Sequence, residues 1–237
     1  MLKLFSRRAK EPAAHCSVVV LGAGSSSRMG QDKIMLPVGD LPVIVHTLRA
    51  FEPLPEVDEV IVVTREDLVP EIAGLCKVFD LKKVKKVVRG GASRVESARI
   101  GTLEADYNAP LIAIHDAARP FVSEDVIRCA ILNAAETGAA APAVPVKDTI
   151  KVVRDGLVEH TPDRATLFAV QTPQVFDASL LRAALQKALD DGAEVTDDCS
   201  AVERLGMKVS LTAGDERNIK LTTPADLALA ELILQEV

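Results

Sequence analysis

Short apolar runs alternate with longer stretches of helical spacing along most of the chain. The runs are rich in Val, Ile and Ala and cover residues 17–21, 59–63, 84–88, 111–114 and 139–144. Strands that are apolar on both alternating faces are typical of a parallel sheet covered by helices on both sides. Helices are predicted between the runs, over residues 43–51, 67–79, 94–104 and 124–137. This alternation predicts an α/β fold, a three-layer sandwich around a mostly parallel sheet.

The pattern changes after residue 144. Residues 148–160 have the alternation of two polar strands joined at Asp155-Gly156, a strong signal for a β-hairpin. A hairpin cannot bury an apolar face on its own, so this one packs on the main body or reaches a partner subunit. We therefore expect a protruding arm at about residues 145–166.

Three more helices are predicted in the last third of the chain. The first covers residues 178–189. Thr196 is the predicted cap of a second helix over residues 197–205, which would end at Gly206. The third begins at Thr223-Pro224, where Thr223 and Asp226 have the spacing of a capping box.

Composition narrows the class of protein. The chain has 237 residues and a formal charge of −6, with only six Phe, one Tyr and no Trp. Proteins that bind single-stranded nucleic acid need aromatic stacking platforms and a positive groove, so we expect no nucleic-acid partner. No apolar run reaches the length of about 18 residues that a membrane-spanning helix needs. We expect a flexible N-terminal tail over residues 1–14 and a single domain over residues 15–237.

The four cysteines indicate a reducing compartment. Cys16, Cys76, Cys129 and Cys199 contain no C-x-x-C pair and have no His at metal-ligand spacing. Charged residues also interrupt the N-terminal segment too early for a signal peptide. The predicted location is the cytoplasm.

Ligands of open α/β sheets bind beyond the carboxyl ends of the strands, so candidate chemistry is sought in the loops after the apolar runs. The loop over residues 21–33 is rich in Gly, Ala and Ser and holds two cations, Arg28 and Lys33. Small residues allow close approach of the backbone, and successive amides can hold phosphate oxygens. The loop lacks the Gly-Lys-Ser/Thr of a P-loop and the third Gly of a dinucleotide fingerprint. A simple tight turn is the alternative.

Three further loops carry candidate residues. Gly90-Gly91 precedes a predicted helix that contains Ser97, where the serine could also be no more than surface. His115-Asp116 and Arg119 follow the most apolar strand, where they could bind a metal ion and a phosphate or form a structural Asp/Arg pair. Lys220 supplies another cation before the last helix.

Taken together, the loop motifs resemble those of the 2-C-methyl-D-erythritol 4-phosphate cytidylyltransferases, which belong to the nucleotidyltransferases with a Rossmann-like fold. The resemblance extends from about Ser17 to the last helix. It is carried by Gly24…Arg28-Met29…Lys33, Gly90-Gly91…Arg94…Ser97, His115-Asp116-Ala117-Ala118-Arg119-Pro120, Val146-Lys147-Asp148-Thr149, Gln171-Thr172-Pro173-Gln174, Thr196-Asp197-Asp198 and Asn218-Ile219-Lys220.

The resemblance implies transfer of a cytidylyl group. The phosphate of methylerythritol phosphate would attack the α-phosphorus of CTP and release pyrophosphate. By motif position, Arg28 and Lys33 are expected to hold the CTP phosphates and stabilise the transition state, and Lys220 to add charge from the other side. Mg²⁺ would bridge the phosphate oxygens, with Asp116 facing the metal or the ribose.

The resemblance also implies binding roles for particular residues. The cytosine would be recognised mainly by backbone groups, with Ser97 as the side-chain contact, and the nucleotide site would comprise Gly22, Ala23, Gly24, Gly91, Ser97 and Asp116. The polyol phosphate would be bound by Asp116, Arg119, Thr149, Arg164, Thr172 and Thr196. In the family, the residues at the positions of Thr149 and Arg164 come from the arm of a neighbouring subunit. The expected assembly is therefore a homodimer with exchanged arms and shared active sites.

Two departures from the family pattern and two alternative functions remain open at this point. A second Gly is usual near Ser26, and an Asp is common where this chain has Ala92. Ribitol 5-phosphate cytidylyltransferases have nearly the same motifs, so the polyol is not fixed by one sequence. A nucleotide-binding protein without turnover is the other alternative, although it would have little need for both Arg28 and Lys33.

Overall fold

The computed structural model describes residues 15–24 and 32–236. Its centre is an eight-stranded sheet in which β11, β6, β1, β4 and β5 lie side by side in that order, and β7 pairs with β10, β11 and β12. The strands are β1 (Cys16–Gly22), β4 (Val57–Thr64), β5 (Val84–Arg89), β6 (Leu111–Asp116), β7 (Ala139–Pro145), β10 (Phe168–Val170), β11 (Gln174–Asp177) and β12 (Ser210–Ala213). β1 lies between β4 and β6 and is parallel to both. The mostly parallel α/β sandwich predicted from the sequence is confirmed, as are its five predicted strands.

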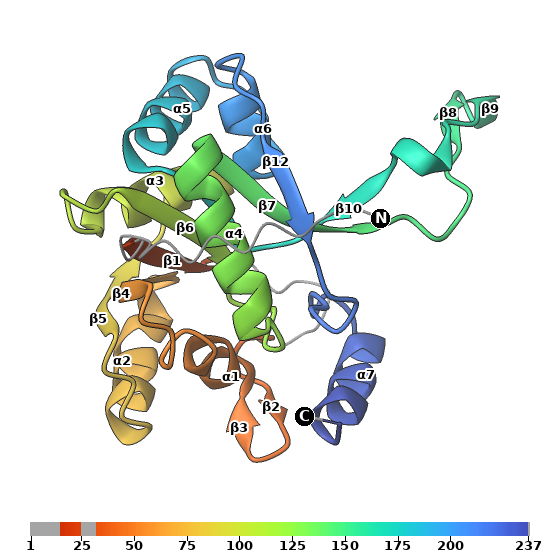
Figure 1. Cartoon of the computed structure of the whole chain (residues 1–237). Coiled ribbons are helices and arrows are strands. Elements are labelled where there is room, and N and C mark those ends of the chain that lie inside the picture. Colours follow the sequence, from red (N-terminus) through yellow and green to blue (C-terminus); the bar gives the residue numbers. More distant parts are fainter. Residues whose placement is uncertain (1–14, 25–31, 237) are drawn as a thin grey trace, which may run out of the picture.

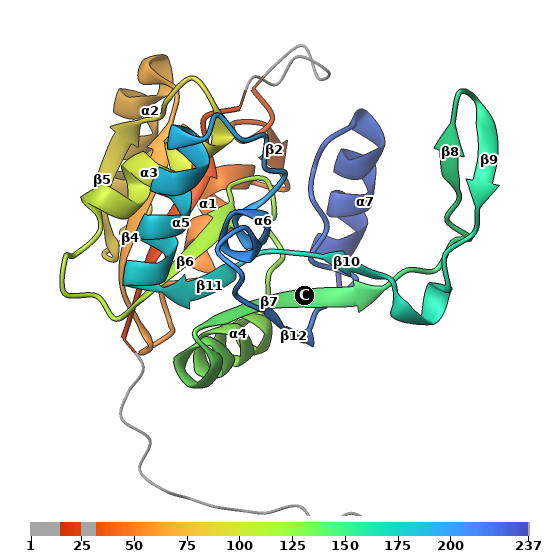
Figure 2. The same ribbon diagram turned by 90° about the horizontal axis from the view of Figure 1, so that it is seen from above.

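Helices cover both faces of the sheet (Figures 1 and 2). They are α1 (Val43–Arg49), α2 (Val69–Val78), α3 (Arg94–Glu104), α4 (Glu124–Thr137), α5 (Ala178–Asp190), α6 (Asp198–Glu203) and α7 (Pro224–Leu234), with short 3-10 helices η1 (Glu66–Leu68) and η2 (Arg164–Thr166). The alternation within β1 separates two cores, because Val18 and Val20 contact the core under α1, α2 and α4. Val19 instead faces the core under α3, α5 and α6. Each face of the sheet is therefore buried.

Several strands were not predicted. β10 and β11 follow one another along the same side of β7 and run antiparallel to it. β11 also pairs with β6, so an antiparallel strand separates two parallel ones. The short strands β2 (Pro37–Val38) and β3 (Leu41–Pro42) form a small ribbon of their own. The polar Gln171-Thr172 step divides β10 from β11, and this interruption hides the strands from a periodicity search.

The predicted hairpin is present as an arm. β8 (Val152–Arg154) pairs with β9 (Leu157–His160) in a separate two-stranded sheet. Asp155 and Gly156 have φ angles of 52° and 79°, the positive values that a tight I′-type turn requires. Figures 1 and 2 both show this arm projecting away from the main body.

Of the two helix caps predicted from the sequence, one is present in the structure and the other is not. At α7 the predicted capping box is confirmed, and the Thr223 amide donates a hydrogen bond to Asp226 Oδ2 at 2.8 Å. The predicted cap at Thr196 is wrong, because α6 is capped by Asp197, which accepts from the Ser200 amide at 2.9 Å. Both residue types cap well, and the extended backbone of Asp197 is what places its carboxylate at the helix end.

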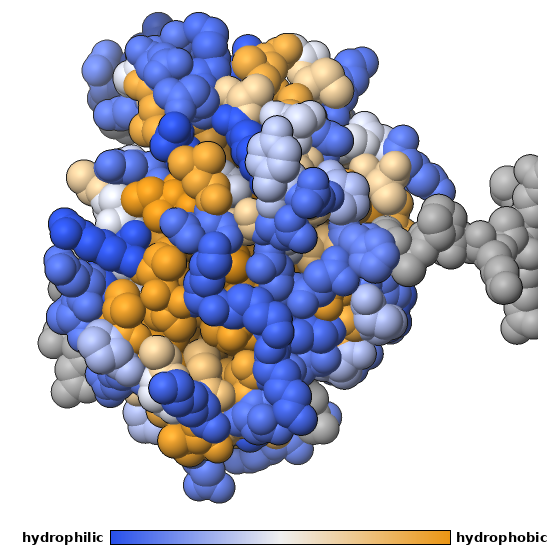
Figure 3. Space-filling model, turned by 90° about the vertical axis from the view of Figure 1, so that its left-hand side faces the viewer, coloured by the Kyte–Doolittle hydropathy of each residue, from blue (hydrophilic) through white to orange (hydrophobic). Residues whose placement is uncertain are grey.

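The lysine-rich stretch around β5 lies at an edge of the sheet. Figure 3 shows the face of the molecule on this side, where hydrophilic side chains surround hydrophobic patches. Lys86 pairs with Glu104 at 3.0 Å, and Lys82 pairs with Asp80 at 3.1 Å. Exposed lysines on an edge strand discourage pairing with another sheet, so the run has a structural explanation. Among the described residues, no helix has the length and apolar character needed to cross a membrane.

Candidate active site

A cavity of about 480 Å³ lies beyond the carboxyl ends of β1 and β6. Its walls are the loop after β1, the loop before α3, the end of β6 and the segment before α7, which are the places where the fold class predicts a ligand. The cavity brings together the predicted site residues Gly22, Ala23, Gly24, Lys33, Gly91, Ser97, Asp116 and Lys220. Arg28, and with it Ser26, lies outside the described residues.

The loop after β1 requires small residues because other elements pack directly against it. A Cβ atom on Gly22 would lie 2.8 Å from Ile34 Cδ1. A Cβ atom on Gly90, across the cavity wall, would lie 2.6 Å from the Ala23 Cβ. Contacts below about 3 Å force a neighbour to move, so larger side chains here would separate the two loops. The glycines thus bring the two loops together at the wall of the cavity.

The loop before α3 is fastened to the first turn of the helix. The Ser97 hydroxyl accepts from the Gly91 amide at 3.1 Å and donates to the Ser93 carbonyl at 2.9 Å. Ser93 caps α3 by accepting from the Glu96 amide, and Glu96 in turn accepts from the Ala92 amide at 2.7 Å. These bonds fix the backbone of the loop in advance of any ligand. Ser97, predicted to contact the base directly, is 3% exposed and holds the loop in shape.

Asp116 lies at the centre of a charged cluster at the end of β6. Lys220 Nζ is 2.9 Å from Asp116 Oδ2, and Arg119 Nε approaches the same oxygen at 3.4 Å. Burial alone would raise the pKa of Asp116, but Lys220, Arg94 and Arg119 together lower it to about 2. Asp116 is therefore ionised, and it holds the Lys220 ammonium at the cavity.

A hydrogen-bonded chain beneath Asp116 explains the neighbouring histidine. The Arg119 carbonyl can only accept, so the His115 nitrogen 3.2 Å from it, Nε2, carries the proton. Nδ1 then accepts from the Thr172 hydroxyl at 3.0 Å, and that hydroxyl oxygen accepts from the Asp116 amide at 3.1 Å. Burial lowers the pKa of His115 to about 4, so the imidazole is neutral. Thr172, predicted to bind substrate, is 3% exposed and supports the strand end that carries Asp116.

The segment Gln171–Gln174 lies between the end of β6 and the segment before α7, and it is hydrogen-bonded to both. Asn218 donates to the Thr172 carbonyl at 2.9 Å and to Gln171 Oε1 at 3.2 Å. The carbonyl of the same Asn218 accepts from Arg119 Nη1 at 2.6 Å. Because Lys220 follows two residues later, these bonds fix the position of its backbone relative to Asp116. Gln171 and Thr172 of the Gln-Thr-Pro-Gln motif and Asn218 of the Asn-Ile-Lys motif therefore form one buried hydrogen-bonded unit.

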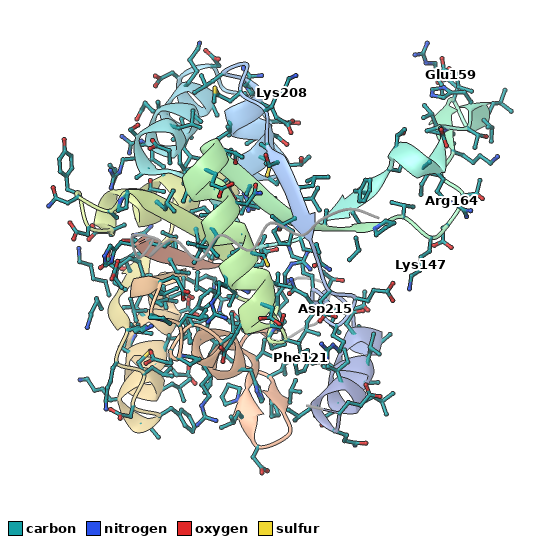
Figure 4. The ribbon with its side chains drawn as sticks, viewed as in Figure 1. Phe121, Lys147, Glu159, Arg164, Lys208 and Asp215 are labelled. Atoms are coloured by element: carbon teal, nitrogen blue, oxygen red, sulfur yellow. The ribbon has the colours of Figure 1, made fainter. Side chains whose placement is uncertain are left out.

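Three predicted substrate-binding residues lie away from this cavity. Thr149 and Arg164 are exposed residues of the arm, and Figure 4 shows Arg164 beside Lys147 at its base. Arg164 Nη1 donates to the Lys147 carbonyl at 2.9 Å. Thr196 is exposed, and its hydroxyl lies 3.1 Å from that of Ser200. None of the three lines the cavity of its own chain among the residues described.

Sequence reasoning gave no role to one cation at the cavity, Arg94. Arg94 lines the cavity, and Nη2 of its guanidinium donates to the buried Asp198 at 2.6 Å. Burial raises the pKa of Asp198, and Arg94 acts against that effect. A signal was available in the sequence, because Arg94 is the first residue of a helix, where the macrodipole disfavours a positive charge.

The donor set suits a divalent ion held mainly by a substrate. The described residues contain no cluster of three or more metal-ligating side chains. Asp116 offers one ionised carboxylate at the cavity, and its Oδ2 already faces Lys220 and Arg119. Mg²⁺ commonly keeps several waters and binds one or two carboxylates together with substrate phosphates. The site thus fits such an ion through Asp116 and lacks an all-protein cage in the described ranges.

Comparison with known proteins identifies the family. The model of the 2-C-methyl-D-erythritol 4-phosphate cytidylyltransferase family matches residues 16–236. The chain belongs to this family. Curated relatives of that name include one from Caldanaerobacter subterraneus, 43% identical over 93% of this chain and 99% of its own. Another, from Symbiobacterium thermophilum, is 45% identical over 93% of each chain.

Solved structures of cytidylyltransferases have the same fold. A 4-diphosphocytidyl-2C-methyl-D-erythritol synthase from Anaerococcus prevotii superposes with a TM-score of 0.84 at 31% identity, covering 94% of this chain and 100% of the other. The 2-C-methyl-D-erythritol 4-phosphate cytidylyltransferase from Thermus thermophilus gives a TM-score of 0.77 at 33% identity, covering 93% and 99%. The resemblance inferred from the motifs is confirmed, and the ribitol alternative is not favoured.

Proposed function

We propose that this chain transfers a cytidylyl group from CTP to 2-C-methyl-D-erythritol 4-phosphate, giving 4-(cytidine 5′-diphospho)-2-C-methyl-D-erythritol and pyrophosphate. This is a step of the non-mevalonate route to isoprenoid precursors. The observation that carries the proposal is the convergence of Lys33 and Lys220 on one cavity, beside the ionised Asp116, in a chain of this family. Two phosphorylated reactants require such a concentration of positive charge.

The residues act mainly by position and charge. The polyol phosphate and CTP are both polyanions, so the barrier falls when they are aligned and when charge developing on the α-phosphoryl group is neutralised. Lys33, with Arg28 from the same loop, is proposed to stabilise that charge. Lys220 is proposed to bind the polyol phosphate from the other side. Asp116 orients Lys220 through their 2.9 Å contact.

The nucleotide would be bound by the two loops that pack together. The backbone of Gly22, Ala23, Gly24 and Gly91 is open to the cavity, and small residues let a base approach it closely. The bonds from Ser97 hold the Gly91 amide in its orientation. A base read by backbone groups also suits a chain without tryptophan.

Mg²⁺ is proposed as the cofactor, held by CTP phosphates with Asp116 as its protein ligand. When bound, the ion supplies charge neutralisation on the phosphate oxygens. Removing divalent ions with a chelator should abolish turnover, and excess Mg²⁺ should restore it. Activity that persists in the chelator at full rate would contradict a metal requirement.

A homodimer with exchanged arms is proposed as the assembly. Hydrophobic side chains on the arm are exposed, including Val153 at 55%, Leu157 at 75% and Val158 at 58%. A free two-stranded hairpin is marginally stable, and exposed apolar patches commonly mark interfaces. The arm would bring Thr149 and Arg164 to the neighbouring subunit's cavity, where they would bind the polyol phosphate. Light scattering on the purified chain distinguishes a dimer from a monomer.

The proposed activity has a direct assay. Pyrophosphate release is measured with CTP and either 2-C-methyl-D-erythritol 4-phosphate or ribitol 5-phosphate as the acceptor. We expect release with the methylerythritol substrate and at least about tenfold lower kcat/KM with the ribitol one, since polar pockets discriminate by their hydroxyl partners. Equal or greater efficiency with ribitol 5-phosphate would contradict the proposed substrate. CTP binding without pyrophosphate release in the presence of either acceptor would favour a nucleotide-binding protein without turnover.

A further inference from the structure

The Arg94–Asp198 ion pair joins the wall of the candidate active site that carries α3 to the start of α6 behind it. Arg94 is the first residue of α3 and follows the loop that holds Gly91. Asp198 is the first residue of α6 and follows Thr196 and Asp197. Arg94 Nη2 donates to Asp198 Oδ2 at 2.6 Å, and the Asp198 side chain has 0% exposure, whereas that of Arg94 has 30%. Part of Arg94 therefore faces the cavity and Asp198 does not.

Stability alone is a poor explanation for this pair. Removing two charges from water costs several kcal/mol, and a buried pair often contributes less than packed apolar residues would. Within the described residues, Arg94 Nη1 and Asp198 Oδ1 are both buried without a hydrogen-bond partner. Arg94 also has the charge that a helix N-terminus disfavours. The ion pair therefore indicates that Asp198 serves to position the Arg94 side chain.

The acidic partner is itself held in place. Gln174 Oε1 accepts from the amides of Asp198 and Cys199, each at 3.0 Å. Gln174 Nε2 donates to Asp197 Oδ2 at 2.8 Å. The start of α6 is thus fixed to β11, which is a central strand of the sheet. Asp198 has a rigid support from which it can hold a guanidinium.

We propose that Asp198 is a positioning residue for the nucleotide: it holds the Arg94 guanidinium at the cavity wall and thereby fixes the loop before α3, without contacting the nucleotide. The inference rests on the proposed function, because CTP is the ligand concerned. Arg94 would then add a fixed positive charge for an anionic nucleotide, next to the Gly91 backbone. Asp198, a residue with no exposed surface, would control CTP affinity through Arg94.

The first test removes the charge of Asp198 and keeps its shape. For Asp198→Asn, the Kd for CTP with Mg²⁺ is measured by calorimetry without the polyol phosphate, and the urea midpoint is measured in parallel. We expect the CTP Kd to rise about tenfold, the scale on which a residue without ligand contact alters ligand binding through its packed neighbours. A Kd within twofold of the parent would overturn the proposal. A parent protein that does not bind CTP would refute the proposed function instead.

The second test separates positioning from folding. In the double variant Arg94→Met with Asp198→Leu, apolar side chains of similar size replace both charges, so we expect the urea midpoint to return close to that of the parent. The CTP Kd should stay at least about tenfold raised, because the positioned charge is absent. Recovery of both the midpoint and the Kd would show that the pair only stabilises the fold.

Two single variants complete the design. Arg94→Lys keeps the charge and loses the guanidinium geometry, so it should leave the urea midpoint near the parent and raise the CTP Kd about three- to tenfold. This variant decides the question if the double variant does not fold, and an unchanged Kd would overturn the proposal. Arg99→Met is the matched control, since Arg99 lies on the same helix but donates to Gln186 at 2.5 Å. Its CTP Kd should equal that of the parent.

Discussion

Lys220 Nζ lies 2.9 Å from Asp116 Oδ2, at the point where the end of β6 meets the segment before α7. Burial acts to raise the pKa of this carboxyl, and Lys220, with Arg94 and Arg119 nearby, lowers it to about 2. The ion pair therefore persists through the physiological range of pH. Its consequence is that the ammonium group is aimed at the cavity before substrate arrives.

The first prediction concerns the pH dependence of this pair. A carboxyl whose folded pKa is below its unfolded value of about 3.9 stabilises the protein above that value. The stabilisation is lost as pH falls from about 4 towards the folded pKa of about 2. Urea unfolding of the parent and of Asp116→Asn should therefore give free energies that converge by about 2 kcal/mol over this window. A difference that stays constant from pH 6 to pH 2 would contradict the assignment.

The second prediction concerns Lys33. Lys33→Ala should lower kcat by about 10²-fold or more, the usual scale for one preorganised donor to a developing charge. The reason is its place in the cavity, at the end of the loop after β1. Steady-state pyrophosphate release measures the effect. Lys208→Ala is the control, because Lys208 is exposed and Figure 4 shows it far from the arm and from Asp215. A kcat within twofold of the parent would exclude the role of Lys33.

The third prediction concerns the arm. Arg164→Ala should raise KM for the polyol phosphate about tenfold or more and change kcat less, because a guanidinium that binds phosphate is lost. KM for CTP should change little. Arg154→Ala is the matched control on the same arm, where Arg154 pairs with Glu159 at 3.7 Å.

Subunit mixing extends this experiment to the shared site. A dimer of one Arg164→Ala chain and one Lys33→Ala chain would contain one intact site and one doubly defective site. At polyol phosphate concentrations well below KM, random pairing of equal amounts should restore about a quarter of the parent activity, since half of the dimers are mixed and each mixed dimer has one intact site of two. Verified mixed dimers without any recovered activity would show that Arg164 serves its own chain or no site.

The parallel part of the fold was predictable because its strands are apolar on both faces. Residues such as Val18, Val19 and Val20 carry that signal by themselves, since two cores require apolar residues at successive positions. β10 and β11 were not predictable in this way. They are short, and the polar Gln171-Thr172 step divides them. The place of β11 between β6 and β7, and the pairing of β10 with β7, depend on contacts that are distant along the chain.

The candidate site was predictable to the extent that its residues follow strands. Asp116 ends β6 and Lys33 lies in the loop after β1, and the topology brings both to one edge of the sheet. For Ser97 and Thr172 the sequence identifies the motifs, and the structure adds that their hydroxyls hydrogen-bond within the protein. Their contacts with ligands stay predictions. The place of the Arg94 side chain depends on its ion pair with Asp198, which is distant along the chain. No local sequence pattern links the two residues.

The fourth prediction concerns the buried histidine. His115 is neutral when folded with a pKa of about 4, whereas an unfolded histidine titrates near 6.5. The folded state therefore binds fewer protons, and stability should fall as pH decreases from about 6.5 to 4, by about 3 kcal/mol in total. His115→Gln removes the titration and can still donate to the Arg119 carbonyl. The parent should lose more stability than this variant over that window. Parallel curves for the parent and His115→Gln would contradict the assignment.

The last prediction uses two glycines in helices as a matched pair. A Cβ atom on Gly101 of α3 would overlap Val19 Cγ1 and lie 2.9 Å from Val63 Cγ2, whereas a Cβ atom on Gly74 of α2 would meet nothing within 4 Å. Gly101→Ala should therefore cost about 1–3 kcal/mol by overpacking. Gly74→Ala should instead stabilise by about 0.5–1 kcal/mol, because alanine restricts the unfolded chain and favours helix.

The two variants should also differ in nucleotide binding. Pushing α3 away from the sheet would displace Ser97, whose hydroxyl fixes the Gly91 amide at the cavity. Gly101→Ala should then raise the CTP Kd, and Gly74→Ala should leave it unchanged. Urea unfolding and calorimetry measure the two effects. If Gly101→Ala proved as stable as Gly74→Ala, α3 would not pack closely on β1 and β4 at this position. The explanation that this packing holds the nucleotide loop in place would then be contradicted.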